Sequence, residues 1–104
     1  MIKVSILYPA TEGSRFDLDY YRDSHMPMVK AKLGAACLKY TIDQGVSGAA
    51  PGSPTPFHAI GTLFFDSVDA FRSSMAPHGK EIGADVKNYT TVAPIMLVSE
   101  AVVG

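Results

Sequence analysis

The spacing of apolar and polar residues along the chain predicts four β-strands. Residues 2–8 and 57–65 are rich in branched and aromatic side chains and are bounded by Pro, Gly and Ser, which is typical of strands. Residues 37–44 and 91–103 carry further alternating runs. Residues 2–8 and 57–65 are apolar on both faces, which predicts that these two strands lie in the centre of the sheet.

A helix is predicted for residues 18–33. Asp17 is a favoured N-cap residue, and Gly34 is a favoured residue just beyond a helix C-terminus. The residues that recur at spacings of three and four, and so share one helical face, are Leu18, Tyr21, His25 and Met28. A histidine therefore belongs to the apolar stripe of this helix, one turn after a tyrosine.

Pro27 lies inside this helix and is expected to disturb it. Proline has no backbone N–H to donate, and it pushes the preceding residue, Met26, away from helical angles. We therefore expect the helix to break or kink just after His25. Such a break frees backbone groups and can aim the imidazole into a cavity.

A second helical region is predicted between the third and fourth strands. Asp66 or Ser67 caps it, and Pro77 restarts it as a first helical residue. The side chains expected to point inward are Val68, Phe71 and Met75, followed by Ile82, Val86 and Tyr89. Gly79 and Gly83 weaken the later part, so one or two short turns are expected there.

The order strand, helix, strand, strand, helix, strand predicts the α+β class and a ferredoxin-like βαββαβ domain over residues 1–104. Right-handed crossovers place both helices on one face of an antiparallel sheet ordered 4-1-3-2. The other face is left bare although it is apolar, so we expect a homodimer with its sheets packed back to back. Residues 45–56, with three glycines and three prolines, form a long loop that is either a lid or a connection without function.

Composition narrows the classes of function. Hydrophobic residues make up 47% of the 104 positions, more than one small sheet and two helices can hide, which again favours an oligomer interface. Nine basic and ten acidic residues give a net charge of −1, so no nucleic-acid partner is expected. No segment resembles a signal peptide or a membrane span, so no membrane partner and a cytoplasmic location are expected.

Cysteine and histidine usage argues against metal and disulfide sites. Cys37 is the single cysteine, and at the start of a predicted strand it is expected to be a small buried hydrophobic side chain rather than a reactive thiol. The three histidines lie in three different elements without zinc-like spacing, and His25 has no neighbouring carboxylate in sequence that points inward. No metal and no cofactor are expected.

His25 is the main candidate for chemistry, with an ordinary alternative. An isolated histidine on an apolar face is more often a packed, hydrogen-bonded core residue than a catalyst. An imidazole with a pKa near neutrality is nevertheless suited to proton transfer, and a nearby tyrosine hydroxyl can orient it or stabilise a developing enolate or phenolate.

One motif resembles a known family. The residues that carry the resemblance are Phe16, Asp17, Tyr20, Tyr21, His25 and Pro27, which match the Phe-Asp-x-x-Tyr-Tyr-x-x-x-His-x-Pro run of the EthD family, named for ethyl tert-butyl ether degradation. The Tyr8-Pro9 strand end and residues 85–90 extend the similarity over nearly the whole chain. The resemblance implies a dimeric α+β barrel with a ligand cleft between the sheet and the helices of each subunit.

Proteins similar in this way include bacterial ether-degradation accessory proteins and fungal enzymes that dehydrate or decarboxylate polyketides. More distant barrels are cofactor-free monooxygenases, lactone isomerases and haem enzymes, and haem is suggested here by fold analogy alone. His25, Tyr21 and Tyr8 are the expected catalytic residues, although either tyrosine is equally well explained as a core ring.

Four other side chains are expected to line the cleft without taking part in the reaction. The expected substrate-binding residues are His58, Asp43, His78 and Met28. His78 is alternatively part of a solvated face, Tyr20 a core ring with its hydroxyl at the surface, and Asp85 a structural hydrogen-bonding residue before the last strand.

Two functions of different classes follow. In one, the protein binds a hydrophobic oxygenated or aromatic small molecule and performs acid–base chemistry without a cofactor, as in a dehydration, decarboxylation or isomerisation. In the other, it is a carrier that holds a hydrophobic intermediate for a partner oxygenase. A catalyst needs polar groups that converge on one cavity, whereas a carrier needs only an apolar pocket.

Overall fold

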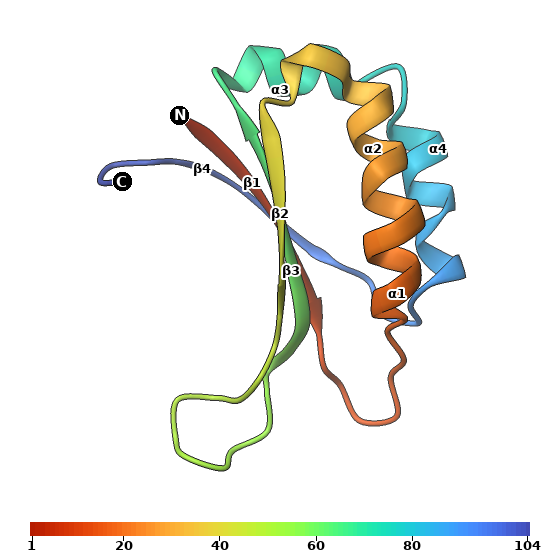
Figure 1. Cartoon of the computed structure of the whole chain (residues 1–104), viewed down its shortest axis with the longest axis vertical. Helices are drawn as coiled ribbons and strands as arrows, with labels where there is room; N and C mark the ends of the chain where they lie inside the picture. Colours follow the sequence, from red (N-terminus) through yellow and green to blue (C-terminus); the bar gives the residue numbers. More distant parts are fainter.

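A computed structural model describes all 104 residues and has an α+β, ferredoxin-like fold. Its strands are β1 (Ile2–Pro9), β2 (Lys39–Gln44), β3 (Phe57–Phe65) and β4 (Ile95–Glu100). They form one sheet in the order β2-β3-β1-β4, with every neighbouring pair antiparallel. This is the predicted order, and the helices gather on one face of the sheet (Figure 1).

Two helical regions cover that face. The first comprises α1 (Leu18–Tyr20), the π-helix η1 (Tyr21–His25), α2 (Met26–Leu33) and the 3₁₀ turn η2 (Gly34–Ala36). The second comprises α3 (Val68–Met75), α4 (Gly79–Ala84) and the 3₁₀ turn η3 (Val86–Asn88). No helix is long and apolar enough to cross a membrane.

The hydrophobic core lies between the sheet and these helices. Alternate residues of the two central strands point toward the helices and are buried, among them Val4, Tyr8, Leu63 and Phe65. From the helices, the first region contributes Met26, Val29 and Leu33 and the second contributes Phe71. Cys37 is also buried, in agreement with the prediction, and burial raises the pKa of its thiol.

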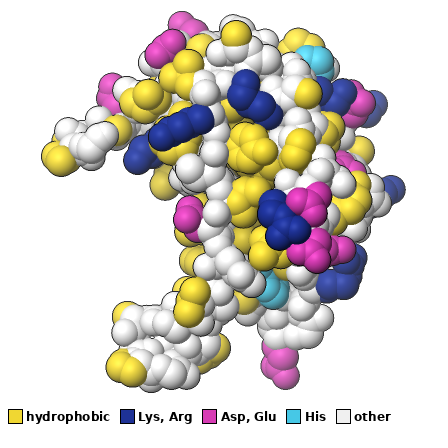
Figure 2. Space-filling model, viewed as in Figure 1, with side chains coloured by type: hydrophobic (Ala, Val, Ile, Leu, Met, Phe, Trp, Pro, Cys, Tyr) yellow, Lys and Arg dark blue, Asp and Glu magenta, His cyan; other side chains and the backbone are white.

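The opposite face of the sheet carries no helix, as predicted. Leu7 of β1 pairs with Ile60 of β3 and with Ile95 of β4, which places these three side chains in one row on that face. Ile95 and Leu97 remain 53% and 56% exposed. Apolar side chains also reach the surface on the C-terminal tail at the left of Figure 2.

The helix around Pro27 differs from the prediction in one respect. Met26 keeps helical angles (φ −65°, ψ −38°), so the chain neither breaks nor leaves the helix there. The hydrogen bonding changes instead, because the N–H of Met26 donates to the carbonyl of Tyr21, five residues earlier. A π-helical turn of this kind accommodates an irregularity in the helix without ending it.

That wider turn also shifts which side chains face inward. Tyr21 and His25 are buried as predicted, but Val29 and Leu33 continue the stripe in place of Met28. Met28 is only half-buried: it packs against the edge of the core and lines a groove between the helices. The extra residue in the π-turn rotates the later helix relative to the spacing assumed from sequence.

The ends of several other helices and strands differ from the predicted ones. Ser67 caps α3 by accepting from the N–H of Ala70, as expected, but α4 begins at Gly79 with His78 as its N-cap, so Pro77 stays in the turn. β2 begins at Lys39 and β4 at Ile95, directly after Pro94. The loop of residues 45–56 has no regular structure and lies at the far end of the sheet from α3 (Figure 1).

Candidate functional site

A cavity of about 240 Å³ lies between the sheet and the helices. Most of its walls are apolar, with Met75, Ile82 and Met96 among the lining residues. The polar side chains in its lining are His25, Tyr8 and Tyr89. An apolar cavity with a few convergent polar groups is the usual form of a small-molecule site.

His25 reaches this cavity from the π-helical turn η1 and is held by a carboxylate. Its Nδ1 lies 2.8 Å from Oδ2 of Asp85, the residue that follows α4. The imidazole is 5% exposed and the carboxylate 18% exposed. No protein group hydrogen-bonds to the other ring nitrogen, Nε2, so this nitrogen is available to a ligand.

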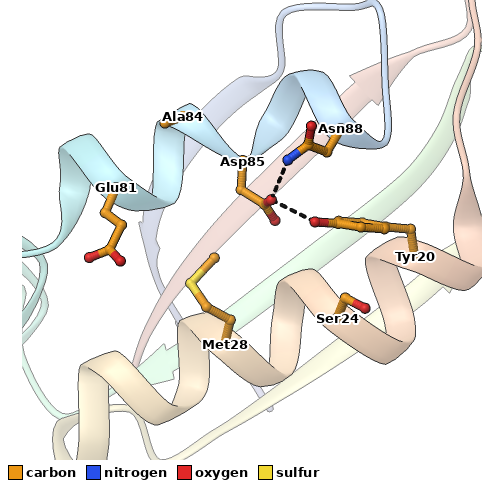
Figure 3. Close-up of a pocket in the computed structure, with 7 residues that line it drawn as sticks. All are labelled: Tyr20, Ser24, Met28, Glu81, Ala84, Asp85 and Asn88. Atoms are coloured by element: carbon orange, nitrogen blue, oxygen red, sulfur yellow. Dashed lines mark hydrogen bonds between the residues drawn. The ribbon is translucent and has the colours of Figure 1, made fainter.

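Asp85 is itself fixed by two further donors. The hydroxyl of Tyr20 donates to Oδ1 of Asp85 at 2.7 Å, and Nδ2 of Asn88 donates to the same oxygen at 2.8 Å (Figure 3). A carboxylate that accepts three hydrogen bonds has little freedom to rotate, and it favours one orientation of the imidazole.

These contacts set the ionisation of the pair. Burial lowers the pKa of His25 below its usual 6.5, although the hydrogen bond and negative charge of Asp85 oppose that effect. Burial alone would raise the pKa of Asp85, but the donors Tyr20, Asn88 and His25 outweigh it and hold that pKa below its usual value. At neutral pH the pair is therefore a neutral imidazole, protonated at Nδ1, beside a carboxylate.

Three tyrosines form the next layer around the imidazole. The hydroxyls of Tyr8 and Tyr89 lie 2.7 Å apart, whereas the buried hydroxyl of Tyr21 has no hydrogen-bonding partner. The rings of Tyr21 and Tyr89 pack against His25 with centroids 5.6 and 4.6 Å away. Burial is the main cause that raises the pKa of all three phenols, so they remain protonated donors.

A second hollow, an open groove of about 340 Å³, lies between the two helical regions. In Figure 3, Tyr20, Ser24 and Met28 project from one side of the groove, and Glu81, Ala84, Asp85 and Asn88 project from the other. Asp85 thus lies between the groove and the cavity. It lines the groove, and its carboxylate is hydrogen-bonded to His25, which lines the cavity.

The structure brings together the three expected catalytic residues but separates the expected substrate-binding residues from them. Tyr8 and His25 line the cavity, and Tyr21 lies directly behind them against Tyr8. Met28 lies in the outer groove because of the shifted helical register, and His78 is half-buried at the start of α4 without lining the cavity.

His58 and Asp43 lie at the far end of the sheet. Nε2 of His58 is hydrogen-bonded to Ser14 at 2.8 Å, and its ring stacks on Phe16 with centroids 5.8 Å apart. Phe16 therefore stands between His58 and the tyrosines. Asp43 is exposed beside the loop of residues 45–56, and no residue of that loop lines the cavity.

Sequence reasoning missed two members of the site. It assigned Asp85 to the turn before the last strand and did not connect it with His25, and it treated Tyr89 only as a core residue. Their spacing of four residues, within a segment that matched the family motif, was the available signal. No group of three His, Cys, Asp or Glu side chains is arranged to hold a metal ion.

Comparisons with known proteins find similarity to one family of domains. The sequence-family model of the EthD domain matches residues 14–92 of this chain. A crystal structure of an EthD-like protein from Ralstonia eutropha JMP134 is 51% identical, with 98% of this chain and 92% of that chain covered and a TM-score of 0.93. No curated protein matches the sequence.

More distant structures share the fold. An ethyl tert-butyl ether degradation (EthD) family protein from Bacillus halodurans C-125 is 18% identical, covers 97% of this chain and 98% of that chain, and has a TM-score of 0.74. The protein At3g17210 from Arabidopsis thaliana is 13% identical, covers 100% and 98% of the two chains, and has a TM-score of 0.70.

Proposed function

The chain belongs to the EthD family, and from that premise we propose that it binds a hydrophobic oxygenated or aromatic molecule in the sheet–helix cavity and transfers a proton on it without a cofactor. The observation that carries the proposal is the His25–Asp85 pair at the wall of an apolar cavity. Burial and a fixed carboxylate together prepare one imidazole nitrogen to act as a base.

His25 and Asp85 have different roles in the proposed proton transfer. Asp85 accepts from Nδ1 of His25 and so leaves the lone pair of Nε2 unprotonated. Nε2 takes a proton from the ligand and becomes part of an imidazolium, whose charge the carboxylate stabilises. The imidazolium then returns the proton to another atom of the ligand, so that the enzyme ends each cycle unchanged.

Tyr20 and Asn88 act as positioning residues. They contact Asp85 from the outer groove and do not line the cavity. Their hydrogen bonds keep Oδ2 of Asp85 directed at the imidazole, which is the role of a supporting layer in a catalytic site.

We also propose that two copies pack through the bare face of the sheet. Leu7, Ile60, Ile95 and Leu97 lie on that face, and the two residues of β4 are more than half exposed. Pairing two such faces would bury apolar surface that a single copy leaves in water.

A carrier function is the second candidate, and the apolar character of most of the cavity wall favours it. A carrier for a partner oxygenase needs affinity but no proton transfer. The two functions therefore differ in one respect that can be measured, which is whether His25 changes the ligand.

The experiment follows C–H exchange of small ring ketones in D₂O by NMR. Catalysed enolisation replaces the hydrogens beside the carbonyl with deuterium, and it requires no knowledge of the natural substrate. We expect wild-type protein to accelerate exchange and His25→Gln to lose about 10²-fold or more of that acceleration. The variant should still bind the ketones.

The matched control is His58→Gln, which removes an imidazole outside the cavity and should leave exchange unchanged. Binding of the ketones without exchange in wild-type protein would favour the carrier. Equal exchange in wild-type and His25→Gln protein would rule out the proposed base.

A further inference from the structure

We propose that the cavity opens to solvent between α4 and β4, and that its ligand is longer than the cavity, with an oxygenated head at His25 and an apolar substituent in this opening. Gly83 is the residue that sets how large the substituent can be. This inference rests on the proposed function, because it names the shape of the substrate for the same cavity.

Exposure locates the opening. Among the residues that line the cavity, only Gly83 of α4 and Met96 of β4 are exposed, and Met96 is 53% exposed. The lining residues of β1, β3 and α2 are all buried or half-buried. The gap between Gly83 and Met96 is here called the mouth of the cavity.

His25 lies in the inner part of the cavity, where its imidazole is 5% exposed. The hydroxyl of Tyr21 is the one side-chain nitrogen or oxygen that is fully buried without a hydrogen-bonding partner. Nε2 of His25 also lacks a partner, so it is not fully buried and keeps contact with the cavity that the residue lines. An unpaired nitrogen on a buried ring points to a ligand independently of the mouth.

Gly83 leaves its side of the mouth without a side chain. A Cβ atom there would meet nothing within 4 Å, so a larger side chain would extend into open space without a collision. Gly79, one turn earlier on α4, also lines the cavity. Two glycines weaken so short a helix, so their contribution is the room that they leave beside the cavity.

Apolar surface continues from the mouth along β4. Met96 and Val98 pair with core residues of β1, which places both side chains on the helix side of the sheet. Val98 is 36% exposed and does not line the cavity. The next residue on that side is Glu100, where a charge ends the apolar strip.

The second copy of the chain does not account for this strip. In the proposed dimer, Ile95 and Leu97 pack on the opposite side of β4, so Met96 and Val98 stay in water there. The strip is continuous with the cavity, because Met96 belongs to both. A ligand with its head in the cavity is therefore the occupant that reaches it.

The volume and the charge of the cavity define the two parts of the ligand. About 240 Å³ is below the roughly 300–1,000 Å³ of pockets that hold drug-sized molecules. The head is therefore no larger than a single ring, and any further group lies in the mouth. No lysine, arginine, aspartate or glutamate lines the cavity, so an uncharged head and an apolar substituent fit it.

The test compares 4-methylcyclohexanone with 4-butylcyclohexanone by calorimetric titration of the full-length protein. Both ketones present the same head, and the butyl group adds methylenes that reach the mouth. We expect the butyl ketone to bind about tenfold more tightly, as partial burial of these methylenes allows. A wild-type ratio of affinities near one, or weaker binding of the butyl ketone, would overturn the proposal.

Gly83→Leu places a side chain in the mouth and should bring this ratio close to one. Ala84→Leu is the matched control, because it makes a similar change at the next residue, which lines the groove between the helical regions and not the cavity. It should retain the wild-type ratio. A full ratio in Gly83→Leu, or an equal loss in Ala84→Leu, would overturn the role of Gly83.

A second measurement on wild-type protein covers the case in which Gly83→Leu does not fold. The terminal methyl of the bound butyl group should give nuclear Overhauser effects to the side-chain methyl of Met96. Effects to Phe71, a buried lining residue, without any to Met96 would overturn the proposal.

Failure of the mouth is distinguishable from failure of the base. A ratio near one with exchange that still depends on His25 would overturn the mouth alone. A full ratio with exchange that is equal in wild-type and His25→Gln protein would support the mouth and overturn the base.

Discussion

The carboxylate oxygen Oδ2 of Asp85 lies 2.8 Å from Nδ1 of His25, although sixty positions separate the two residues in the chain. The contact joins the two helical regions above the sheet. It also gives a buried imidazole a defined tautomer, which an isolated core histidine would not need.

Replacing this carboxylate should weaken catalysis without removing the base. Asp85→Asn retains the shape of the side chain but loses the charge that stabilises the imidazolium, so ketone exchange should fall by about 10²-fold. The pKa of His25 should fall further as well, because Asp85 is the group that raises it against the effect of burial. Exchange rates and an NMR titration of His25 check both effects.

Asp43→Asn is the matched control, since Asp43 is an exposed carboxylate outside the cavity. It should change neither quantity. Unchanged exchange in Asp85→Asn would show that the carboxylate has no part in the reaction.

Stability should fall on acidification in two steps. Burial holds the pKa of folded His25 below 6.5, so the unfolded chain binds the proton first, and its stabilisation is lost as the pH falls below about 6.5. The pKa of folded Asp85 lies below 3.8, so its contribution is present above that pH and is lost as the pH falls further.

The first step can be isolated by substitution. In His25→Gln, the decrease in melting temperature between pH 7.5 and pH 5.5 should be smaller than in wild-type protein. An equal decrease in both proteins would show that other groups account for the acid sensitivity.

The contact between Gly61 and the hydroxyl of Tyr21 predicts a coupled pair of substitutions. A Cβ atom at Gly61 would collide with that hydroxyl, and a fully buried ring cannot move away easily. Gly61→Ala should therefore cost about 1–3 kcal/mol of unfolding free energy. Tyr21→Phe should offset most of this loss, because it removes the colliding atom.

Gly83→Ala provides the control, since nothing lies within 4 Å of a Cβ there and the residue belongs to helix α4. It should stabilise the protein by about 0.5–1 kcal/mol. Chemical denaturation measures all four variants, and additive effects of Gly61→Ala and Tyr21→Phe would contradict the contact.

The bare face of the sheet predicts the state of association. Light scattering should give a mass twice the 11.1 kDa of one chain. Leu97→Asp should produce a monomer, because it buries an unpaired charge in the proposed interface. Ser73→Asp, on the exposed surface of α3, should leave the mass unchanged, and a compact wild-type monomer would contradict the proposed pairing.

The arrangement of elements could be predicted from the sequence because it depends on local pattern. β3 spans the predicted residues Phe57–Phe65, and Asp17 and Gly34 cap the predicted helix of residues 18–33, so these boundaries agree with the structure. Handedness and strand order then follow from general rules of connection.

The site could be predicted only in part, because its contacts join distant positions. His25, Tyr21 and Tyr8 were identifiable from a helical stripe and a strand end, but the pairing of His25 with Asp85 depends on how two helices pack. A count based on 3.6 residues per turn also could not predict the π-turn at Tyr21–His25, after which Val29 rather than Met28 continues the buried stripe.

The tautomer of His25 tests the central claim most directly, and ¹⁵N NMR at neutral pH reports it without any ligand. The account predicts a neutral imidazole with the proton on Nδ1, which donates to Asp85, and an unprotonated Nε2 that lines the cavity. A proton on Nε2, or a charged imidazolium at pH 7, would contradict the assignment of His25 as the base.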